Sequence, residues 1–170
     1  MLRRLRLNIF VLDKNPQNAA LYHADKHIVK MVLETAQLLS TAVRFYKADA
    51  DYMYKTAYVN HPCAKWARAS RDNFHWLTSL GLYLFHEYNF RYGKDHKSGS
   101  IIRTARMKYE NIIPAGPLTP FAQAMPDEYK NEDAVKAYRA YYRGAKAHLL
   151  NYTRRLPPKW IADIATYKEK

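Results

Sequence analysis

Hydrophobic residues recur mainly at three- and four-residue spacing along this chain, which is the period of an α-helix rather than of a strand. Two long stretches carry this pattern, residues 16 to about 46 and residues 62 to about 92. Both begin with a polar residue followed by proline, Asn15-Pro16 and His61-Pro62, and Gly93 is a natural stop for the second. The pattern therefore predicts two long helices.

Shorter patterns fill the rest of the chain. The apolar run at residues 5–12 predicts an extended segment or a lone short strand. Residues 113–126 are rich in proline, which excludes a regular helix, and they carry enough apolar side chains to predict a packed loop. Further helices are predicted at residues 101–111 and 132–152 and, as a short final piece, at about 160–164.

The chain shows no internal repeat and no linker long enough to separate two domains. Its length of 170 residues suits one domain. We therefore expect an all-α fold, in which residues 1–170 form a single compact helical domain of four to six helices with a short extended N-terminal segment.

Charge changes the functional picture. The chain has 28 Lys and Arg against 15 Asp and Glu, which gives a formal net charge of +13, and such a surplus attracts phosphate backbones. The basic residues are spread along the chain rather than gathered in a tail, which favours a folded basic surface. DNA is therefore the leading expected partner, and a small phosphorylated substrate is the alternative.

Other features exclude several classes of protein. The single cysteine, Cys63, rules out an internal disulfide and a cysteine-rich zinc module, and it fits a reducing compartment. We recognise no membrane span, no targeting segment, no P-loop, no dinucleotide glycine motif and no EF-hand. We expect a cytoplasmic protein with no membrane partner, no cofactor and no metal, whose oligomeric state the sequence leaves open.

One face of the first predicted helix is polar in an unusual way. With 3.6 residues per turn, this face holds His23, His27, Lys30, Glu34, Gln37 and Thr41, with Lys26 at its edge. The rest of the helix is almost wholly apolar, so we expect the helix to be central. A solvated face usually alternates Lys, Glu, Arg and Asp, whereas these side chains titrate, donate and accept. The pattern therefore favours a functional cleft over a plain solvated face.

Several chemistries fit this face. Glu34 beside Lys30 suits an ion pair or an acid–base pair, and a lysine with a lowered pKa can act as a nucleophile. The His23 and His27 pair has metal-ligand spacing, but the neighbouring lysines would repel a cation, so a phosphate is the better ligand. Our catalytic candidates are His23, Lys26, His27, Lys30, Glu34 and, from the second helix, Glu87.

Further polar groups suit nucleic-acid binding. The end of the second helix holds four potential donors to an anion, and the last long helix combines a basic stripe with interleaved tyrosines, which is typical of a surface that follows a nucleic-acid backbone. Both groups have plainer interpretations as cations at a helix end and as an exposed basic face. Our phosphate-binding or nucleic-acid-binding candidates are Gln37, Asn73, Arg91, Lys94, His96, Lys97, Arg139, Arg143 and Lys146.

Several short motifs occur together in this chain, and they cover most of it: Phe10-Val11-Leu12-Asp13, His23-Ala24-Asp25-Lys26-His27, Lys30-Met31, Glu34-Thr35-Ala36-Gln37, Asn60-His61-Pro62-Cys63, Arg91-Tyr92-Gly93-Lys94-Asp95-His96-Lys97, Pro120-Phe121-Ala122 and Met125-Pro126-Asp127-Glu128. The combination resembles a family of small tailed-bacteriophage proteins that stand beside phage DNA-modification and base-excision enzymes, including proteins labelled pyrimidine dimer glycosylases. The resemblance implies a phage protein that works in the infected bacterial cell. Residues 1–7 depart from the shorter start of these proteins, which argues against the α-amino group as a nucleophile.

Our leading hypothesis is an enzyme that acts on DNA bases. One fitting reaction is that of a DNA glycosylase, with Glu34 or Glu87 stabilising positive charge on the sugar and Lys26 or Lys30 as the amine nucleophile. The other is a base-modifying transferase, whose cationic clusters hold a phosphate or pyrophosphate leaving group. Either enzyme must take the base out of the stack. The alternatives are a non-catalytic basic DNA-binding protein, a phage enzyme acting on a small anionic nucleotide and, as the weakest, a metal-dependent nuclease.

Overall fold

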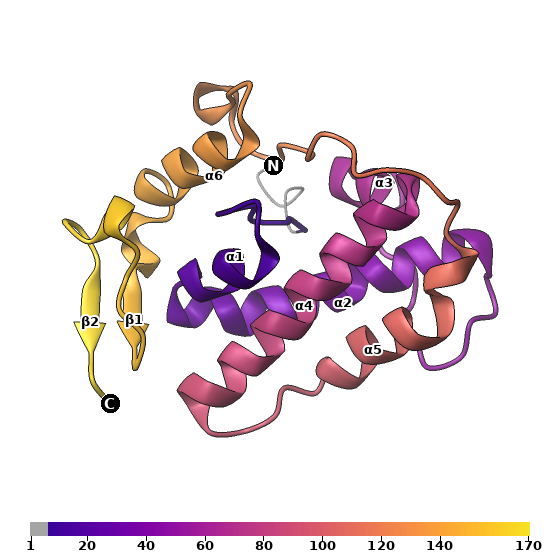
Figure 1. Ribbon diagram of the computed structural model, residues 1–170, viewed down its shortest axis with the longest axis horizontal. Coiled ribbons are helices and arrows are strands. Elements are labelled where there is room, and N and C mark those ends of the chain that lie inside the picture. The colour runs from indigo at the N-terminus through magenta and orange to yellow at the C-terminus, as the bar shows by residue number, and fades with distance from the viewer. Residues whose placement is uncertain (1–6) are drawn as a thin grey trace.

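The computed structural model describes residues 7–170, and this part of the chain is a helical domain with one small sheet (Figure 1). Its six α-helices and two strands are α1 (Pro16–Tyr22), α2 (Asp25–Tyr46), α3 (Pro62–Ala69), α4 (Arg71–Tyr92), α5 (Gly99–Thr104), α6 (Ala134–Arg143), β1 (Asn151–Thr153) and β2 (Thr166–Lys168). The predicted all-α class is thus confirmed. The strands pair in parallel, Tyr152 opposite Tyr167, and the sequence did not predict them.

The core lies around α2 and α4, which pack on each other, while α1, α3 and α5 cover them (Figure 1). As expected, α2 is central, and its apolar side chains, among them Ile28, Met31 and Leu39, are fully buried. Residues 7–12 are all buried and form neither helix nor strand, which confirms the extended N-terminal segment. The rest of the predicted run at residues 5–12, and all but the last residue of the extension at residues 1–7, lie outside the described residues.

The prediction of one unbroken helix over residues 16–46 is wrong, because the chain turns at His23 and Ala24. His23 has an extended backbone, with φ −67° and ψ 135°, and so ends α1. The guanidinium of Arg91 on α4 takes the carbonyl oxygens of Leu21 and His23 that a continuing helix would have used. A tertiary contact therefore sets this break, and sequence periodicity carries no sign of it.

The second long helix is broken as well, at Ser70. Its backbone is fully extended, and its hydroxyl accepts from the amide of Asn73 while donating to the carbonyl of Pro117 at 2.6 Å. Serine is a good N-cap residue, so Ser70 ends α3 and starts α4 at once. Ser70 is a polar residue between the apolar positions Trp66 and Phe74 of the helical pattern, and it lies at the break.

The shorter elements also differ in extent from their predictions. The helix predicted at residues 101–111 is α5, followed by a π-helical turn, Ala105–Tyr109, and a 3-10 turn, Glu110–Ile112. The helix predicted at residues 132–152 ends at Arg143, because Gly144 leaves helical geometry. The final short helix is a 3-10 turn, Lys159–Ile161, and residues 113–126 form the predicted irregular loop.

Glycine lets α5 pack closely on α4. A Cβ atom at Gly99 would collide with the ring of Phe85, and one at Gly81 would lie 2.8 Å from the methyl group of Thr35 and 3.0 Å from Ile102. These close approaches place the start of α5 beside the end of α4. In residues 7–170 we find no helix with the length and apolar character needed to cross a membrane.

Candidate active site

Glu34 is a charged side chain at the edge of the core. It lies on α2 and is only 5% exposed. Its Oε2 accepts from the backbone amide of Asn8 at 3.1 Å, and its Oε1 lies 3.5 Å from Nζ of Lys30, one turn earlier on the helix. The Lys30 side chain is 56% exposed. A nearly buried carboxyl group thus touches an amine that can reach solvent.

Burial raises the pKa of Glu34 to about 7, against the opposing pull of Lys30, of the Asn8 amide and of Lys146. Desolvation disfavours the charged form of a carboxyl group, and nearby cations favour it. A carboxyl group with a pKa near 7 exchanges a proton at neutral pH, which is what a general acid or base requires. Such a group beside an amine is a candidate reacting centre.

Lys146 lies close to this pair, although it follows the end of α6. Burial and the charge of Lys30 lower its pKa, and Glu34 opposes the shift. Its Nζ lies 5.2 Å from the centre of the Tyr141 ring, within range of a cation–π contact. The basic stripe predicted on the last helix therefore divides, because the charge of Lys146 acts on Glu34 whereas Arg139 and Arg143 pair with Asp13 and Asp163.

Asn8 holds Glu34 in place, and the sequence interpretation missed it. The Asn8 amide group donates to the carbonyl of Ala124 at 2.7 Å, and its Oδ1 accepts from the hydroxyl of Tyr138 at 2.8 Å. These contacts fix the backbone amide that points at Glu34. The signal was present, because Asn8 is the one polar residue among the otherwise apolar residues 7–12.

Cys63 also meets this network. Its thiol lies 3.7 Å from Oδ1 of Asn8, and it is fully buried. Burial raises the pKa of the thiol to about 12. The thiolate, which is the reactive form, is therefore not populated at neutral pH.

The two histidines of the predicted polar face lie beside this site but inside the core. His23 and His27 stack with ring centres 5.4 Å apart, and the edge of the His27 ring meets Phe10. The hydroxyl of Tyr142 accepts from the amide of Ala24 and lies 2.8 Å from Nδ1 of His27, so it is placed to donate to that nitrogen. Burial lowers the pKa of His23 to about 4 and that of His27 well below its usual value. Both rings are therefore neutral at physiological pH.

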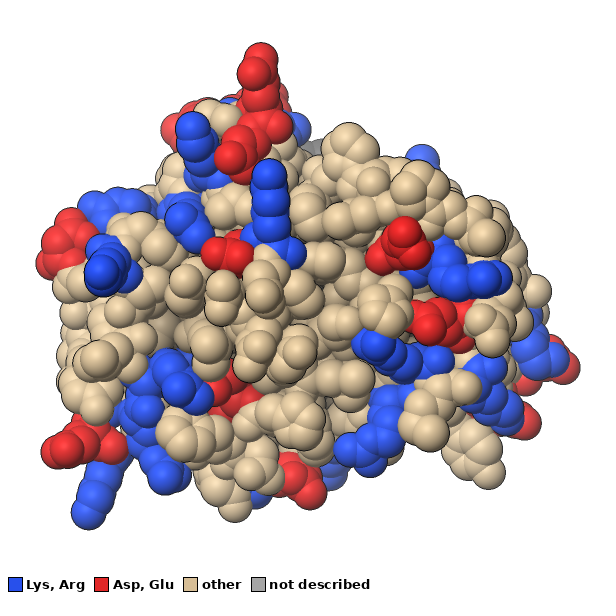
Figure 2. Space-filling model, in the orientation of Figure 1, with Lys and Arg blue, Asp and Glu red and all other residues tan. Residues whose placement is uncertain are grey.

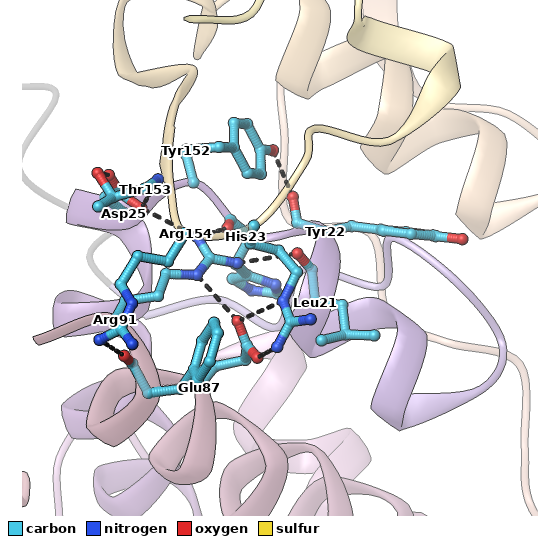
Figure 3. Close-up of polar contacts among 12 residues, drawn as sticks. Leu21, Tyr22, His23, Asp25, Glu87, Arg91, Tyr152, Thr153 and Arg154 are labelled. Carbon is cyan, nitrogen blue, oxygen red and sulfur yellow. Dashed lines mark hydrogen bonds and ion pairs between the residues drawn. The ribbon is translucent and has the colours of Figure 1, made fainter. Parts of the chain in front are cut away.

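Glu87 and Arg91 form a separate cluster around the turn between α1 and α2 (Figure 3). The Arg91 guanidinium donates to Glu87 at 2.9 Å, to Asp25 at 3.1 Å and to two backbone carbonyls. The other oxygen of Glu87 accepts from Arg155 at 2.6 Å. The polar atoms of these groups bond to one another, and none of the bonds involves Glu34.

The other binding candidates are scattered. Lys26, Lys94 and Lys97 are exposed, and Gln37 is half-buried one turn after Glu34. Asn73 is fully buried and ties α4 to the loop through Thr119 and to α3 through the Trp66 carbonyl. The remaining two arginines make tertiary contacts, Arg139 with the carbonyl of Leu12 and with Asp13, and Arg143 with Asp163 and the Trp160 carbonyl.

The ring of His96 is held by a hydrogen bond at each of its nitrogens. Its Nδ1 accepts from the amide of Ser98 at 3.1 Å, and its Nε2 lies 3.0 Å from the carbonyl oxygen of Val29 on α2. Because a carbonyl only accepts, Nε2 carries the proton, and both ring nitrogens are occupied. This contact joins the basic segment after α4 to the exposed face of α2.

That exposed face runs past Glu34. Lys26, Val29, Lys30 and Leu33 are all exposed on α2, and Glu34 and His27 border them on the side where the N-terminal segment packs. The groups around Glu34 therefore meet at the edge of an open surface. Five surface clefts of the described chain are lined by other residues.

Positive charge is not separated from negative charge on the face that Figure 2 shows. The face in Figure 2 mixes Lys and Arg with Asp and Glu, and its centre carries few charges. Among residues 7–170, no three His, Cys, Asp or Glu side chains are grouped so that they could hold a metal ion.

Comparison with known proteins gives one finding. The sequence model of a family described as pyrimidine dimer DNA glycosylase matches residues 7–99, more than half of the 170-residue chain. The matched part includes Asn8, Lys30 and Glu34 and ends before α6. No match was found among curated proteins or among solved structures. The chain belongs to the pyrimidine dimer DNA glycosylase family.

Proposed function

We propose that this protein is a DNA glycosylase that excises a base at a pyrimidine dimer, with Glu34 and Lys30 at its reacting centre. The observation that carries the proposal is the Glu34 carboxyl group, almost buried, with its pKa raised to about 7 and an exposed amine 3.5 Å away. Family membership supports DNA as the substrate. The resemblance to tailed-phage proteins supports a phage gene whose product works in the infected cell.

The chemistry assigns one role to each group. A glycosylase breaks the bond between C1′ of the deoxyribose and the base nitrogen, and positive charge develops on the sugar. The Glu34 carboxylate stabilises that charge, while the amine of Lys30 attacks C1′. The base leaves with the bonding electrons and takes up a proton, and the attacking amine gives a proton to Glu34. The sugar ring then opens to give an imine, which water hydrolyses.

The neighbouring groups position the DNA and the acid. Lys26 and Lys146 flank Glu34 and Lys30, and both can neutralise backbone phosphates. Gln37, one turn further along α2, can contact the same strand. We assign His23 and His27 to the support of the site, because they are neutral and packed in the core. Glu87 and Arg91 hold the turn between α1 and α2 rather than touching DNA.

Trapping with borohydride tests the proposal. Reduction of the imine links enzyme and DNA covalently, so wild-type protein should crosslink to a duplex that contains one thymine dimer. Lys30→Ala should abolish the crosslink, and Glu34→Gln should slow excision by about 100- to 10,000-fold, the usual contribution of one acid–base group. Matched controls are Lys65→Ala, an exposed lysine on α3, and Glu110→Gln, whose carboxylate pairs with His75.

Three outcomes would contradict the assignment. A crosslink that survives Lys30→Ala but not Lys146→Ala would move the nucleophile to Lys146. Full excision by Glu34→Gln would remove Glu34 from the chemistry. Wild-type protein that binds duplex DNA but excises nothing would be a non-catalytic binding protein or would require another modified base as its substrate.

A further inference from the structure

A second polar site lies at the opposite flank of the exposed face of α2. The end of α4, the segment after it and the start of α5 enclose a cleft of about 580 Å³. Its lining includes His86, Asn89, His96, Lys97 and Arg103. In the chain from residue 7 onward, neither Lys97 nor Arg103 lies within ion-pair distance of a carboxylate.

The one carboxylate in the cleft already has a partner. Asp95 accepts from the side-chain amide of Asn89 at 2.6 Å. Two fixed cations and two imidazoles therefore face one occupied carboxylate, and the cleft has a positive balance. Lys and Arg side chains also gather over α5 at the lower right of Figure 2.

The fold places the chain segments that carry these two cations. His96 is fixed between the Val29 carbonyl and the Ser98 amide, and its ring packs edge-on against Tyr88 with centres 4.9 Å apart. Lys97 follows it directly. Gly99 lets α5 approach Phe85, and Arg103 of α5 lies over the same ring, 6.0 Å from its centre.

The position of the cleft relative to Glu34 can be compared with the spacing of phosphates along a DNA strand. Val29, which His96 contacts, precedes Glu34 by five residues, or about 8 Å along the helix axis at 1.5 Å per residue. Five residues also rotate by about 140° beyond one full turn of the helix, so the cleft lies around α2 from Glu34 as well as along it. One strand of B-DNA carries a phosphate about every 3.4 Å along its axis, so a strand whose damaged nucleotide lies at Glu34 would reach the cleft with a phosphate more than two nucleotides away.

We infer that this cleft is a subsite for a phosphodiester of the DNA strand that carries the lesion, with Lys97 and Arg103 as its ligands. His96 is a positioning residue, because its ring nitrogens are already bonded to the protein. The inference rests on the proposed function for the identity of the DNA, and it adds a contact that lies outside the reacting centre.

Salt-dependent binding of an undamaged duplex tests the subsite without any chemistry. Affinity is measured by fluorescence anisotropy between 50 and 200 mM salt. Loss of one phosphate contact should lower the slope of log affinity against log salt by about 0.9 in magnitude. The double variant Lys97→Ala/Arg103→Ala should show this loss, whereas Lys97→Arg/Arg103→Lys should keep the wild-type slope. The control Lys55→Ala/Lys65→Ala removes the same charge from exposed positions away from the cleft and should keep the slope.

Equal slopes in the two alanine double variants, or wild-type protein that does not bind duplex DNA, would overturn the subsite. Displacement of the duplex by a free nucleoside triphosphate at constant ionic strength, lost in Lys97→Ala/Arg103→Ala, would reassign the cleft to a small nucleotide. The proposed reacting centre and the proposed subsite are tested by different measurements. Glu34→Gln should lose excision with a normal slope, whereas the cleft variant is judged by its slope on undamaged duplex, on which no excision takes place.

Discussion

At the scale of single residues, we expect Glu34 to lower the free energy of unfolding as pH rises and to be necessary for activity. The folded protein holds a proton on Glu34 up to about pH 7, whereas the ordinary value is 4.5. Stability therefore falls as pH rises through this range, because the native state binds the proton more tightly. Glu34→Gln removes that cost, so we expect the variant to be inactive yet more stable than wild type by about 1–3 kcal/mol at pH 8.

Urea unfolding at pH 8 and pH 4.5 measures this difference. At the lower pH the carboxyl group is largely protonated in the folded state, so the advantage of the variant should shrink. Glu110→Gln should show no such pH-dependent gain. A variant that is less stable than wild type at pH 8 would contradict the assigned burial cost.

The stacked histidines act in the opposite direction. The pKa of His23 falls from 6.5 to about 4 and that of His27 falls further, so acid protonates both rings in the unfolded chain before it does so in the native state. Stability from these groups is fully present above pH 6.5 and is lost as pH falls toward 4. In the Glu34→Gln background we expect a loss of up to about 2–3 kcal/mol per pH unit, since each group contributes about 1.4.

Denaturant unfolding between pH 7 and pH 4 checks this slope. His27→Gln should remove about half of it, and the exposed His86→Gln should leave it unchanged. A flat profile in the Glu34→Gln background would mean that the two rings are not held neutral.

The sequence identified the proposed reacting residues better than the residues that support them. Lys30 and Glu34 share a helical face at four-residue spacing, so their contact follows from local geometry alone. Asn8 and Lys146 reach Glu34 from far along the chain, and no local pattern places them there. The same limit explains Arg91. The sequence favoured it as a phosphate ligand, but its guanidinium binds the backbone at the turn between α1 and α2.

At the scale of helices, Arg91 should be the residue that the turn between α1 and α2 tolerates least. Its planar guanidinium serves two carboxylates and two carbonyls at once (Figure 3). Lysine cannot reproduce this geometry, and loss of a buried partner leaves charge uncompensated. We expect Arg91→Lys to cost about 2–4 kcal/mol in thermal or urea unfolding. Arg143→Lys, at an exposed pair with Asp163, should cost less than about 1 kcal/mol.

The contact between α4 and α5 gives a second test at this scale. Gly99→Ala places a methyl group against the Phe85 ring and should cost about 1–3 kcal/mol, as overpacking does. Phe85→Leu in the same chain should recover part of the loss, because a smaller side chain makes room. Equal unfolding midpoints for Gly99→Ala and wild type would show that α5 shifts freely.

Element prediction succeeded where local chemistry decides the outcome. Asn15-Pro16, His61-Pro62 and Gly93 mark helix ends as expected, and each acts through its own backbone or side chain. The breaks at His23 and Ser70 depend on Arg91 and on the loop carbonyl of Pro117, which lie far away in sequence. The two short strands depend equally on distant partners.

At the scale of the whole molecule, the C-terminal part should unfold together with the helices. Thr153 of β1 donates to Asp25 through both its amide and its hydroxyl, and the Tyr152 hydroxyl donates to the Tyr22 carbonyl. These contacts tie the small sheet to the turn between α1 and α2. We therefore expect tryptophan fluorescence and far-ultraviolet circular dichroism to give one coincident urea transition. Two separated transitions would mean that the tail is an independent unit.

The net charge of +13 indicated a nucleic-acid partner without indicating a surface. Many cations are used within the fold, Arg91, Arg139 and Arg143 among them. The lysines of α2 and the cleft at α5 remain open to a partner. Overall charge thus predicts the class of ligand, and only the tertiary structure separates internal cations from external ones.

The buried state of Cys63 has a practical consequence. With its thiol sealed in the core and its pKa near 12, the natural protein should resist alkylating reagents while folded. A cysteine introduced at exposed Ser100, on the rim of the α5 cleft, would then be the single reactive position. A fluorophore attached there could report the arrival of a DNA strand in real time, without first removing a native side chain from the interior.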